Sequence, residues 1–141
     1  AAVKEVCGIE LQRDLYSWVV LAGYMRLFSE NFTKRLGGGP QGTVRAVNIH
    51  PSLLPAFPGV DSYAQAYAHG VKVTGCTVHL VDEELDHGPI VKQSVVPVLP
   101  GDTSETLSAR ILAEEHKTYT EAVALILSGQ FHIEGRRIIE S

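Results

Sequence analysis

The sequence predicts an α/β domain built on an open, mostly parallel sheet with flanking helices. Apolar runs rich in β-branched residues at 16–22, 43–49 and 73–81 stop at glycine, histidine-proline or aspartate, as buried strands do. Helical patterns with start and stop signals follow the second of these runs and return after residue 101. Strands that alternate with helices favour an open sheet covered by helices, and 141 residues suffice for one domain.

The first strand is expected at residues 16–22. Residues 37–42 then form a glycine-rich loop, which lacks the lysine and the following helix of a phosphate-binding loop. The next strand is expected at 43–49. Two prolines in the segment 51–55 follow it directly and stop regular pairing, so the chain is expected to leave the sheet there.

Asp61 is expected to cap a helix of about two turns that Gly70 ends. The strands at 73–81 and 89–98 come next. They are expected to pair around an acidic loop at 82–88.

The C-terminal part begins with a capping box, Asp102 with Glu105, that opens a long helix ending at Gly129. The tail at 130–139 is expected to form two short strands. The apolar positions of the long helix fit helical spacing: Leu107, Ile111, Leu112, Tyr119, Val123 and Ile126.

Composition and charge narrow the class of function. A net charge of −4, a pI near 5.8 and the absence of a basic block argue against nucleic acid or an anionic membrane as partner, which leaves small molecules. Cys7 and Cys76 have no Cys/His cluster around them, so neither a disulfide framework nor a zinc site is predicted. The apolar runs are shorter than the ~20 residues of a membrane helix, and no export signal is visible. A cytoplasmic monomer or homodimer is expected.

Three polar side chains form the strongest candidate for a catalytic site. Asn48 and His50 are two residues apart at the end of a strand, so they leave the same face. Asp86 follows in the acidic loop, and the carboxyl ends of strands in an open parallel sheet share one crevice. An amide, an imidazole and a carboxylate suit a reaction in which negative charge develops on a carbonyl oxygen, such as acyl or formyl transfer.

Each of these residues also has a structural interpretation. His50 alone could cap a strand end, Asn48 could form a turn, and Asp86 lies in a sequence that many tight turns use. His79 and His116 match no metal-ligand spacing and are expected to be structural, and no metal is predicted.

Three segments in register resemble the folate-dependent formyltransferases: NIHPSLLPAFPG from Asn48, VTGCTVHLVDEELDHGPI from Val73 and GDTSETLSARILAEEHKTYTEA from Gly101. With residues 18–26 the resemblance covers roughly residues 15–130, and it is greatest to the branch that formylates phosphoribosylglycinamide. It implies a Rossmann-like formyltransferase fold. Members of the family begin about seventy residues before the first matched segment, so the N-terminal phosphate-binding portion is expected to be missing from this chain.

The resemblance implies transfer of the formyl group from 10-formyltetrahydrofolate, as cosubstrate, to the amine of 5′-phosphoribosylglycinamide in de novo purine biosynthesis. Asn48 and protonated His50 would stabilise the oxyanion of a tetrahedral intermediate. Asp86 would keep His50 charged. No metal and no covalent enzyme adduct are implied.

The resemblance also implies binding residues. Ala56 and Asp61 replace a basic residue and a histidine of some relatives, which bears on substrate affinity. An ordinary loop and core is the alternative interpretation of the segment 25–28, and an exposed helix position is the alternative for Glu115. The folate site would comprise Met25, Arg26, Leu27, Phe28, Asn48, Val81, Asp82, Glu83, Glu84, Leu85 and Asp86, and the glycinamide ribonucleotide site Gly23, Met25, Ile49 and Glu115.

Two alternative functions stay open. A formyltetrahydrofolate hydrolase would use the same three catalytic residues with water as the nucleophile. A non-catalytic fragment would bind folate only, because the part expected to grip the substrate phosphate is missing.

Overall fold

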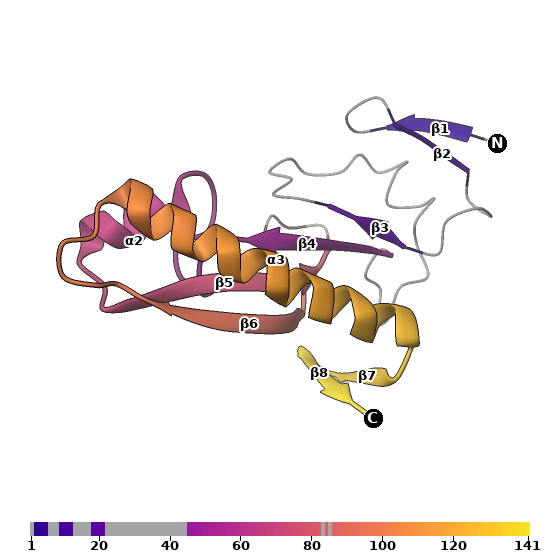
Figure 1. Ribbon diagram of the computed structural model, residues 1–141. Helices are drawn as coiled ribbons and strands as arrows, with labels where there is room; N and C mark the ends of the chain where they lie inside the picture. Colours follow the sequence, from indigo (N-terminus) through magenta and orange to yellow (C-terminus); the bar gives the residue numbers. More distant parts are fainter. Residues whose placement is uncertain (1, 6–8, 13–17, 22–44, 83, 85) are drawn as a thin grey trace.

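The computed structural model describes residues 2–5, 9–12, 18–21, 45–82, 84 and 86–141. Its elements are β1 (Ala2–Glu5), β2 (Ile9–Gln12), β3 (Val19–Val20), β4 (Ala46–His50), α2 (Ser62–His69), β5 (Val73–Leu80), β6 (Ile90–Pro97), α3 (Ser104–Ser128), β7 (Phe131–Glu134) and β8 (Arg137–Glu140) (Figure 1). β1 and β2 pair with each other, a hairpin that the sequence analysis did not predict. The other strands form one six-stranded sheet in the order β3-β4-β5-β6-β8-β7.

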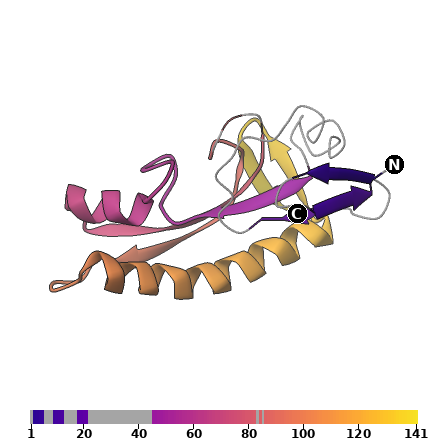
Figure 2. The ribbon, with the colours of Figure 1, turned by 90° about the horizontal axis from the view of Figure 1, so that it is seen from above.

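The predicted open α/β sheet is confirmed, because β3 and β7 form separate edges of the sheet. Helix α3 runs along one face of the sheet, and α2 lies beside its N-terminal part (Figures 1 and 2). Among the described residues, no helix is both long and apolar enough to cross a membrane.

The expectation of a mostly parallel sheet is wrong for the described strands. Only the pairs β3–β4 and β6–β8 are parallel, whereas β4–β5, β5–β6 and β7–β8 are antiparallel. Strands β5 and β6 are joined by a loop at 81–89 without a crossover helix, and a parallel pair requires a long crossover. The prediction that these two strands pair around the acidic loop is confirmed.

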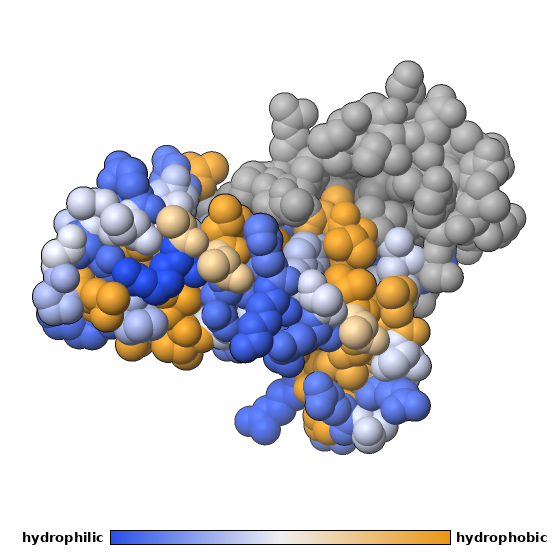
Figure 3. All heavy atoms as spheres, in the orientation of Figure 1, coloured by the Kyte–Doolittle hydropathy of each residue, from blue (hydrophilic) through white to orange (hydrophobic). Residues whose placement is uncertain are grey.

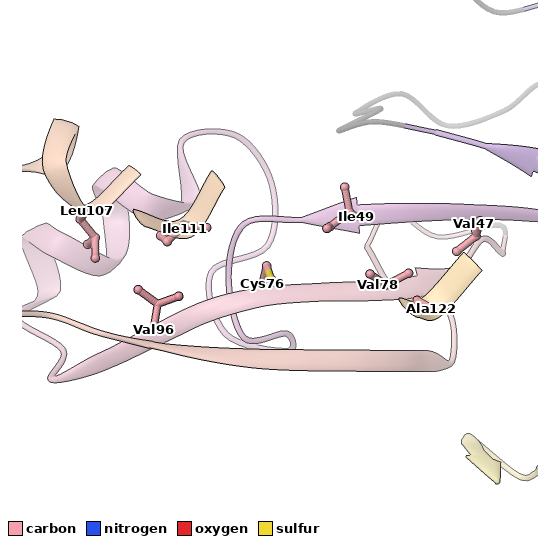
Figure 4. Close-up of a cluster of buried hydrophobic side chains, with 8 residues drawn as sticks. All are labelled: Val47, Ile49, Cys76, Val78, Val96, Leu107, Ile111 and Ala122. Carbon is pink, nitrogen blue, oxygen red and sulfur yellow. The ribbon is translucent and has the colours of Figure 1, made fainter. Parts of the chain in front are cut away.

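Alternation along β4 and β5 separates the two faces of the sheet. Val47, Ile49, Cys76 and Val78 point toward α3 and form the core with residues of that helix (Figure 4). Their neighbours in sequence therefore point to the opposite face. This places the side chains of Asn48, His50, Thr77 and His79 on the face away from α3.

Helix α3 ends at Gly129 as predicted, but its N-terminal cap differs from the expectation. The capping box is Thr103 with Thr106, one residue after the predicted pair that began at Asp102. Asp102 instead accepts hydrogen bonds from the Leu99 N–H and from both terminal nitrogens of Arg110. The Arg110 guanidinium and the Leu99 N–H hold the pKa of Asp102 well below its usual range, so this carboxylate fixes the turn before the helix.

Two further expectations for the helices need correction. Asp61 does occupy the N-cap position of α2, but its backbone is left-handed at φ 53 and its side chain makes no capping hydrogen bond. Gly70 ends the helix as predicted. In α3, Leu112 is 51% exposed because the helix turns this position away from the sheet, whereas Leu107 and Ile111 are buried.

Replacing Thr103 by alanine is expected to lower the free energy of unfolding by about 1 kcal/mol. The substitution removes the hydroxyl that accepts from the Thr106 N–H at 3.2 Å and leaves that donor without its capping partner. Denaturant unfolding measures the loss. Thr120→Ala is the control, since the Thr120 hydroxyl donates back to the His116 carbonyl in the middle of the helix and caps neither end. Equal losses in the two variants would contradict the assigned cap.

A second apolar cluster joins the C-terminal hairpin to the sheet. Leu80 at the end of β5, Ile126 near the end of α3 and Ile133 in β7 are buried together, and Ile138 of β8 packs against them. Strand β8 adds one parallel pair, Ile90 with Arg137. The two strands predicted in the tail are therefore confirmed. They contact the residues on either side of the loop at 81–89, Leu80 and Ile90.

Candidate functional site

The candidate site lies on the sheet face opposite α3. Asn48 is directly opposite His79 in the antiparallel pairing of β4 and β5, and His50 is opposite Thr77. All four side chains are buried. Asp86, from the loop at 81–89, completes the group, and its side chain is fully buried too.

The ring of His50 lies between two hydrogen-bond acceptors. Its Nε2 is 2.9 Å from the carbonyl oxygen of Phe57, and its Nδ1 is 3.4 Å from Oδ2 of Asp86. The ring is 1% exposed, so both contacts lie away from water. The Phe57 carbonyl accepts a hydrogen bond from Nε2, whereas the Nδ1–Oδ2 approach is an electrostatic contact without a hydrogen bond.

Asp86 is held from several sides. Its Oδ2 accepts a hydrogen bond from the Gly59 N–H at 3.0 Å, and its Oδ1 lies 3.7 Å from Nε2 of His79. The second distance exceeds a hydrogen bond but allows electrostatic attraction. Burial raises the pKa of Asp86, but the contacts with His79 and Gly59 and the charge of His50 lower it by more, so that it lies below the ordinary aspartate value. The side chain is therefore a carboxylate at neutral pH.

We expected Asp86 to meet His50 because the carboxyl ends of parallel strands share one crevice. That expectation is wrong, because β4 and β5 are antiparallel and their carboxyl ends lie at opposite ends of the strand pair. The loop at 81–89 folds back instead. Asp86 adopts the left-handed conformation at φ 52, and a Cβ on Gly88 would lie 1.7 Å from the Leu80 carbonyl oxygen. The close approach at Gly88 thus turns the chain and returns Asp86 to the sheet.

Asn48 has a defined side-chain orientation. Its Oδ1 accepts a hydrogen bond from the Ile49 N–H at 2.9 Å, and the residue is 3% exposed. Because the oxygen faces the backbone of β4, the NH₂ group, on the other branch of the planar amide, points away from that N–H. That group is the end of Asn48 that can donate to a carbonyl or an oxyanion.

The segment after β4 is fixed to the same face by a polar hub at Thr77. The Thr77 hydroxyl donates to the Ser52 carbonyl at 2.7 Å and accepts from the Leu54 N–H at 3.1 Å. The Gln93 amide donates to the hydroxyl of Thr77 and to the carbonyl of Leu54. This hub holds the chain that carries the Phe57 carbonyl and the Gly59 N–H to His50 and Asp86.

Residues predicted to bind folate are found around the loop at 81–89. Asp82 accepts from the Glu84 N–H at 2.9 Å, and its other oxygen lies 2.8 Å from Nδ1 of His87. Glu84 approaches Nε2 of His87 at 3.5 Å. Val81 continues the pairing with β4 through a hydrogen bond to the Ala46 carbonyl. Outside the described residues are Gly23, Met25, Arg26, Leu27, Phe28, Glu83 and Leu85, together with the loop at 37–42.

Two residues predicted to bind the second substrate are not brought to the catalytic group. Ile49 points toward α3, and Glu115 lies on α3 itself. Burial raises the pKa of Glu115. Burial also raises the pKa of the Cys76 thiol, and the charge of Glu115 adds to that rise, which places the carboxylate near the α3 side of β5.

The α3 face carries an apolar hollow of about 450 Å³, lined by Val20, His116, Tyr119, Thr120 and Val123. Apolar side chains gather along the C-terminal half of α3 on this face (Figure 3), where Leu127 is 64% exposed. None of the predicted catalytic residues lines the hollow. The chemistry of the buried polar group, and not this hollow, identifies the candidate active site.

Sequence reasoning missed part of the group. His79 was interpreted as structural, although it lies 3.7 Å from Asp86. The signal that could have found it is its spacing of two residues from Thr77 in a strand that pairs with β4. The Phe57 carbonyl and the Gly59 N–H are backbone groups, which no residue pattern reveals. Among the described residues, no cluster of His, Cys, Asp and Glu could hold a metal ion.

The chemical capacity of the site follows from these contacts. It contains a buried carboxylate, an imidazole between that carboxylate and the Phe57 carbonyl, and an amide whose oxygen is bonded to the backbone. Donors placed at a carbonyl oxygen stabilise the negative charge that develops when a nucleophile adds to the carbonyl carbon. An imidazole in its protonated form can also supply a proton to a leaving group.

Comparison with known proteins agrees with this chemistry. The chain is 47% identical over 127 residues to the phosphoribosylglycinamide formyltransferase of Bacillus subtilis, which covers 90% of this chain and 62% of the relative. The crystal structure of glycinamide ribonucleotide transformylase 1 from Symbiobacterium toebii is 52% identical with a TM-score of 0.79, covering 88% of this chain and 56% of that one. A formyltetrahydrofolate deformylase from Pseudomonas syringae is 31% identical with a TM-score of 0.77, covering 88% and 40%.

The chain thus spans less than two thirds of the length of these relatives. The family model described as formyl transferase matches residues 8–123, which include β4, β5, β6 and the whole candidate site. On this match, and on the identity to solved members, the chain belongs to the formyl transferase family.

Proposed function

We propose that the site transfers the formyl group of 10-formyltetrahydrofolate to the amine of 5′-phosphoribosylglycinamide, a step of de novo purine biosynthesis. The observation that carries the proposal is the buried pair of His50 and Asp86 on the same sheet face as Asn48. In the proposed site the carboxylate favours the charged form of the imidazole. The relatives named phosphoribosylglycinamide formyltransferase or glycinamide ribonucleotide transformylase, at 47% and 52% identity, favour this acceptor.

In the proposed reaction the substrate amine adds to the formyl carbon, and the carbonyl electron pair moves to the oxygen. The NH₂ of Asn48 and an N–H of His50 stabilise this oxyanion. Collapse of the intermediate breaks the bond to N10 of the folate, which takes up a proton as the amine loses one. No covalent bond to the protein forms. The carboxylate of Asp86 holds the charge of His50 throughout.

The contacts of His50 add a condition to this mechanism. Its Nδ1 faces Asp86, so the N–H that can reach a substrate is on Nε2, which now donates to the Phe57 carbonyl. A substrate oxygen has to replace that carbonyl as acceptor. Ser52 and Leu54 on one side of Phe57 are held by Thr77, and Gly59 on the other side is held by Asp86. The proposed exchange of acceptor is therefore a local movement of the Phe57 peptide.

We propose 10-formyltetrahydrofolate as the cosubstrate on the side of the loop at 81–89. Val81, Asp82 and Glu84 supply backbone groups and carboxylates around that loop, which suit a heterocycle rich in N–H donors. The formyltetrahydrofolate deformylase relative supports the same class of cosubstrate.

The similarity to a formyltetrahydrofolate deformylase makes hydrolysis of 10-formyltetrahydrofolate the second candidate function. In a hydrolase, water would take the place of the amine at the same three residues. Transfer is favoured because the deformylase is 31% identical to this chain, against 47% and 52% for the two transferases.

The test measures release of tetrahydrofolate from 10-formyltetrahydrofolate by absorbance, with and without glycinamide ribonucleotide, using the whole chain. Release that depends on the ribonucleotide is the expected result. Release without it would replace the proposal by hydrolysis. Absence of release in both reactions would contradict catalysis by this chain, and equilibrium binding of a dideaza folate analogue would then identify a folate-binding polypeptide.

A further inference from the structure

The loop that delivers Asp86 is in contact with the C-terminal hairpin at three places. Leu80, just before the loop, packs on Ile133 of β7, and Ile90, just after it, pairs with Arg137 of β8. Between these points, a terminal nitrogen of the Arg136 guanidinium donates to the carbonyl oxygen of His87. The hairpin lies at the end of the β5–β6 pair where this loop turns (Figure 1). Arg136 lies beyond residues 8–123, so the family match does not include it.

The residue that Arg136 holds is covalently next to the catalytic carboxylate. Asp86 has φ 52, a conformation that residues with a Cβ adopt at a cost, so contacts around it must maintain it. On the side chain, these contacts include the Gly59 N–H, His50 and His79. On the following peptide, the contact is the hydrogen bond from Arg136.

The imidazole of His87 ties the same residue to the first half of the loop. Its Nδ1 lies 2.8 Å from Asp82 and its Nε2 3.5 Å from Glu84. The imidazole is 47% exposed, so these ion pairs alone are screened by water and weak. Arg136 adds a donor that comes from a part of the fold anchored in the apolar cluster of Leu80 and Ile133.

We propose that Arg136 is a positioning residue, which holds the peptide after Asp86 so that the Asp86 carboxylate keeps its place against His50 and Gly59. It contacts no reacting atom. This inference rests on the proposed function only for its kinetic consequence, because the geometry itself can be measured without turnover. The predicted consequence is that the C-terminal hairpin controls how well the catalytic carboxylate is placed.

The test compares Arg136→Ala with Arg137→Ala, a neighbouring exposed arginine of the same hairpin, and with Arg136→Lys, which keeps a cationic donor. The first readout is hydrogen exchange of the Gly59 N–H, which is bonded to Asp86. We expect about 3- to 10-fold faster exchange in Arg136→Ala, the range for loss of one exposed hydrogen bond, with partial rescue in Arg136→Lys and no change in Arg137→Ala.

The second readout is kinetic. In Arg136→Ala we expect kcat to fall by about 3- to 10-fold, because Asp86 is less well placed against His50. We expect a smaller change in KM for glycinamide ribonucleotide. Unchanged Gly59 exchange in Arg136→Ala, or an equal effect in Arg137→Ala, would overturn the proposal. If exchange responds but the wild-type chain releases no tetrahydrofolate, the positioning role stands and the proposed function fails.

Discussion

Replacing Asp86 by asparagine is expected to lower turnover by about 10²- to 10⁴-fold, the range for loss of a group that supports acid–base catalysis. The amide is nearly the same size, and its oxygen can still accept from the Gly59 N–H. What disappears is the negative charge 3.4 Å from Nδ1 of His50, and with it the reason for that nitrogen to keep its proton. Steady-state release of tetrahydrofolate measures the effect.

Glu140→Gln provides the matched control for loss of one carboxylate, since Glu140 is exposed at the end of β8. Its turnover is expected to equal that of the unmodified chain. Circular dichroism should give the same spectrum for both variants. An Asp86→Asn variant with near-native turnover and native spectrum would show that the pair with His50 is structural.

The same substitution predicts a pH dependence of stability. The pKa of Asp86 in the folded protein lies below the ordinary aspartate value of the unfolded chain, so its charged form stabilises the fold at pH values above that ordinary value. The stabilisation is lost as the pH falls from the ordinary value through the lower folded value. The difference in melting temperature between the wild type and Asp86→Asn should therefore be full at neutral pH and should shrink in acid, below the ordinary pKa of aspartate. A difference that stays constant into acid would contradict the depressed pKa.

Replacing Gly88 by alanine is expected to reduce both stability and turnover. The added Cβ would lie 1.7 Å from the Leu80 carbonyl oxygen and 2.6 Å from its carbon, and neither backbone atom can move without breaking the β5–β6 pair. Relief of the clash would cost the hydrogen bond from the Leu80 N–H to the Pro89 carbonyl, now 2.9 Å. We expect a loss of about 2–4 kcal/mol in the free energy of unfolding, from overpacking and the lost hydrogen bond.

Turnover of Gly88→Ala should fall together with its stability, because the displaced peptide carries Asp86 away from His50. Gly101→Ala separates this steric effect from simple backbone strain. Gly101 has φ +87 and nothing within 4 Å of the added Cβ, so that variant should lose about 1 kcal/mol and no turnover. If Gly88→Ala resembles Gly101→Ala in both measurements, the tight turn at Gly88 does not place Asp86.

Local patterns in the sequence predicted most elements because their causes are local. Gly70 and Gly129 end their helices in the left-handed conformation, which glycine adopts without strain. The pairing of β5 with β6 followed from two β-branched runs on either side of an acidic loop. The start of α3 was misplaced by one residue because Arg110, eight positions away, binds Asp102 in preference to capping.

The relation between strands was not predictable in the same way. The direction of β5 relative to β4 depends on how the segment after Pro51 packs on Thr77, which is a contact between residues distant in sequence. For the candidate site, the face shared by Asn48 and His50 followed from a spacing of two residues. The approach of Asp86 to His50 depends on the close contact between Gly88 and the Leu80 carbonyl, which leaves no room for a Cβ. The sequence around Gly88 indicated only a turn, because the contact with Leu80 is not visible in a local pattern.

The hydroxyl of Tyr119 in α3 donates to the carbonyls of Val47 in β4 and of Leu21, the residue after β3. Tyr119 follows Leu21 by 98 residues and Val47 by 72 residues. At about 5–20 residues synthesised per second, Tyr119 therefore leaves the ribosome about 5–20 s after Leu21. Until then the contact that joins α3 to the β3–β4 pair cannot form in the nascent chain.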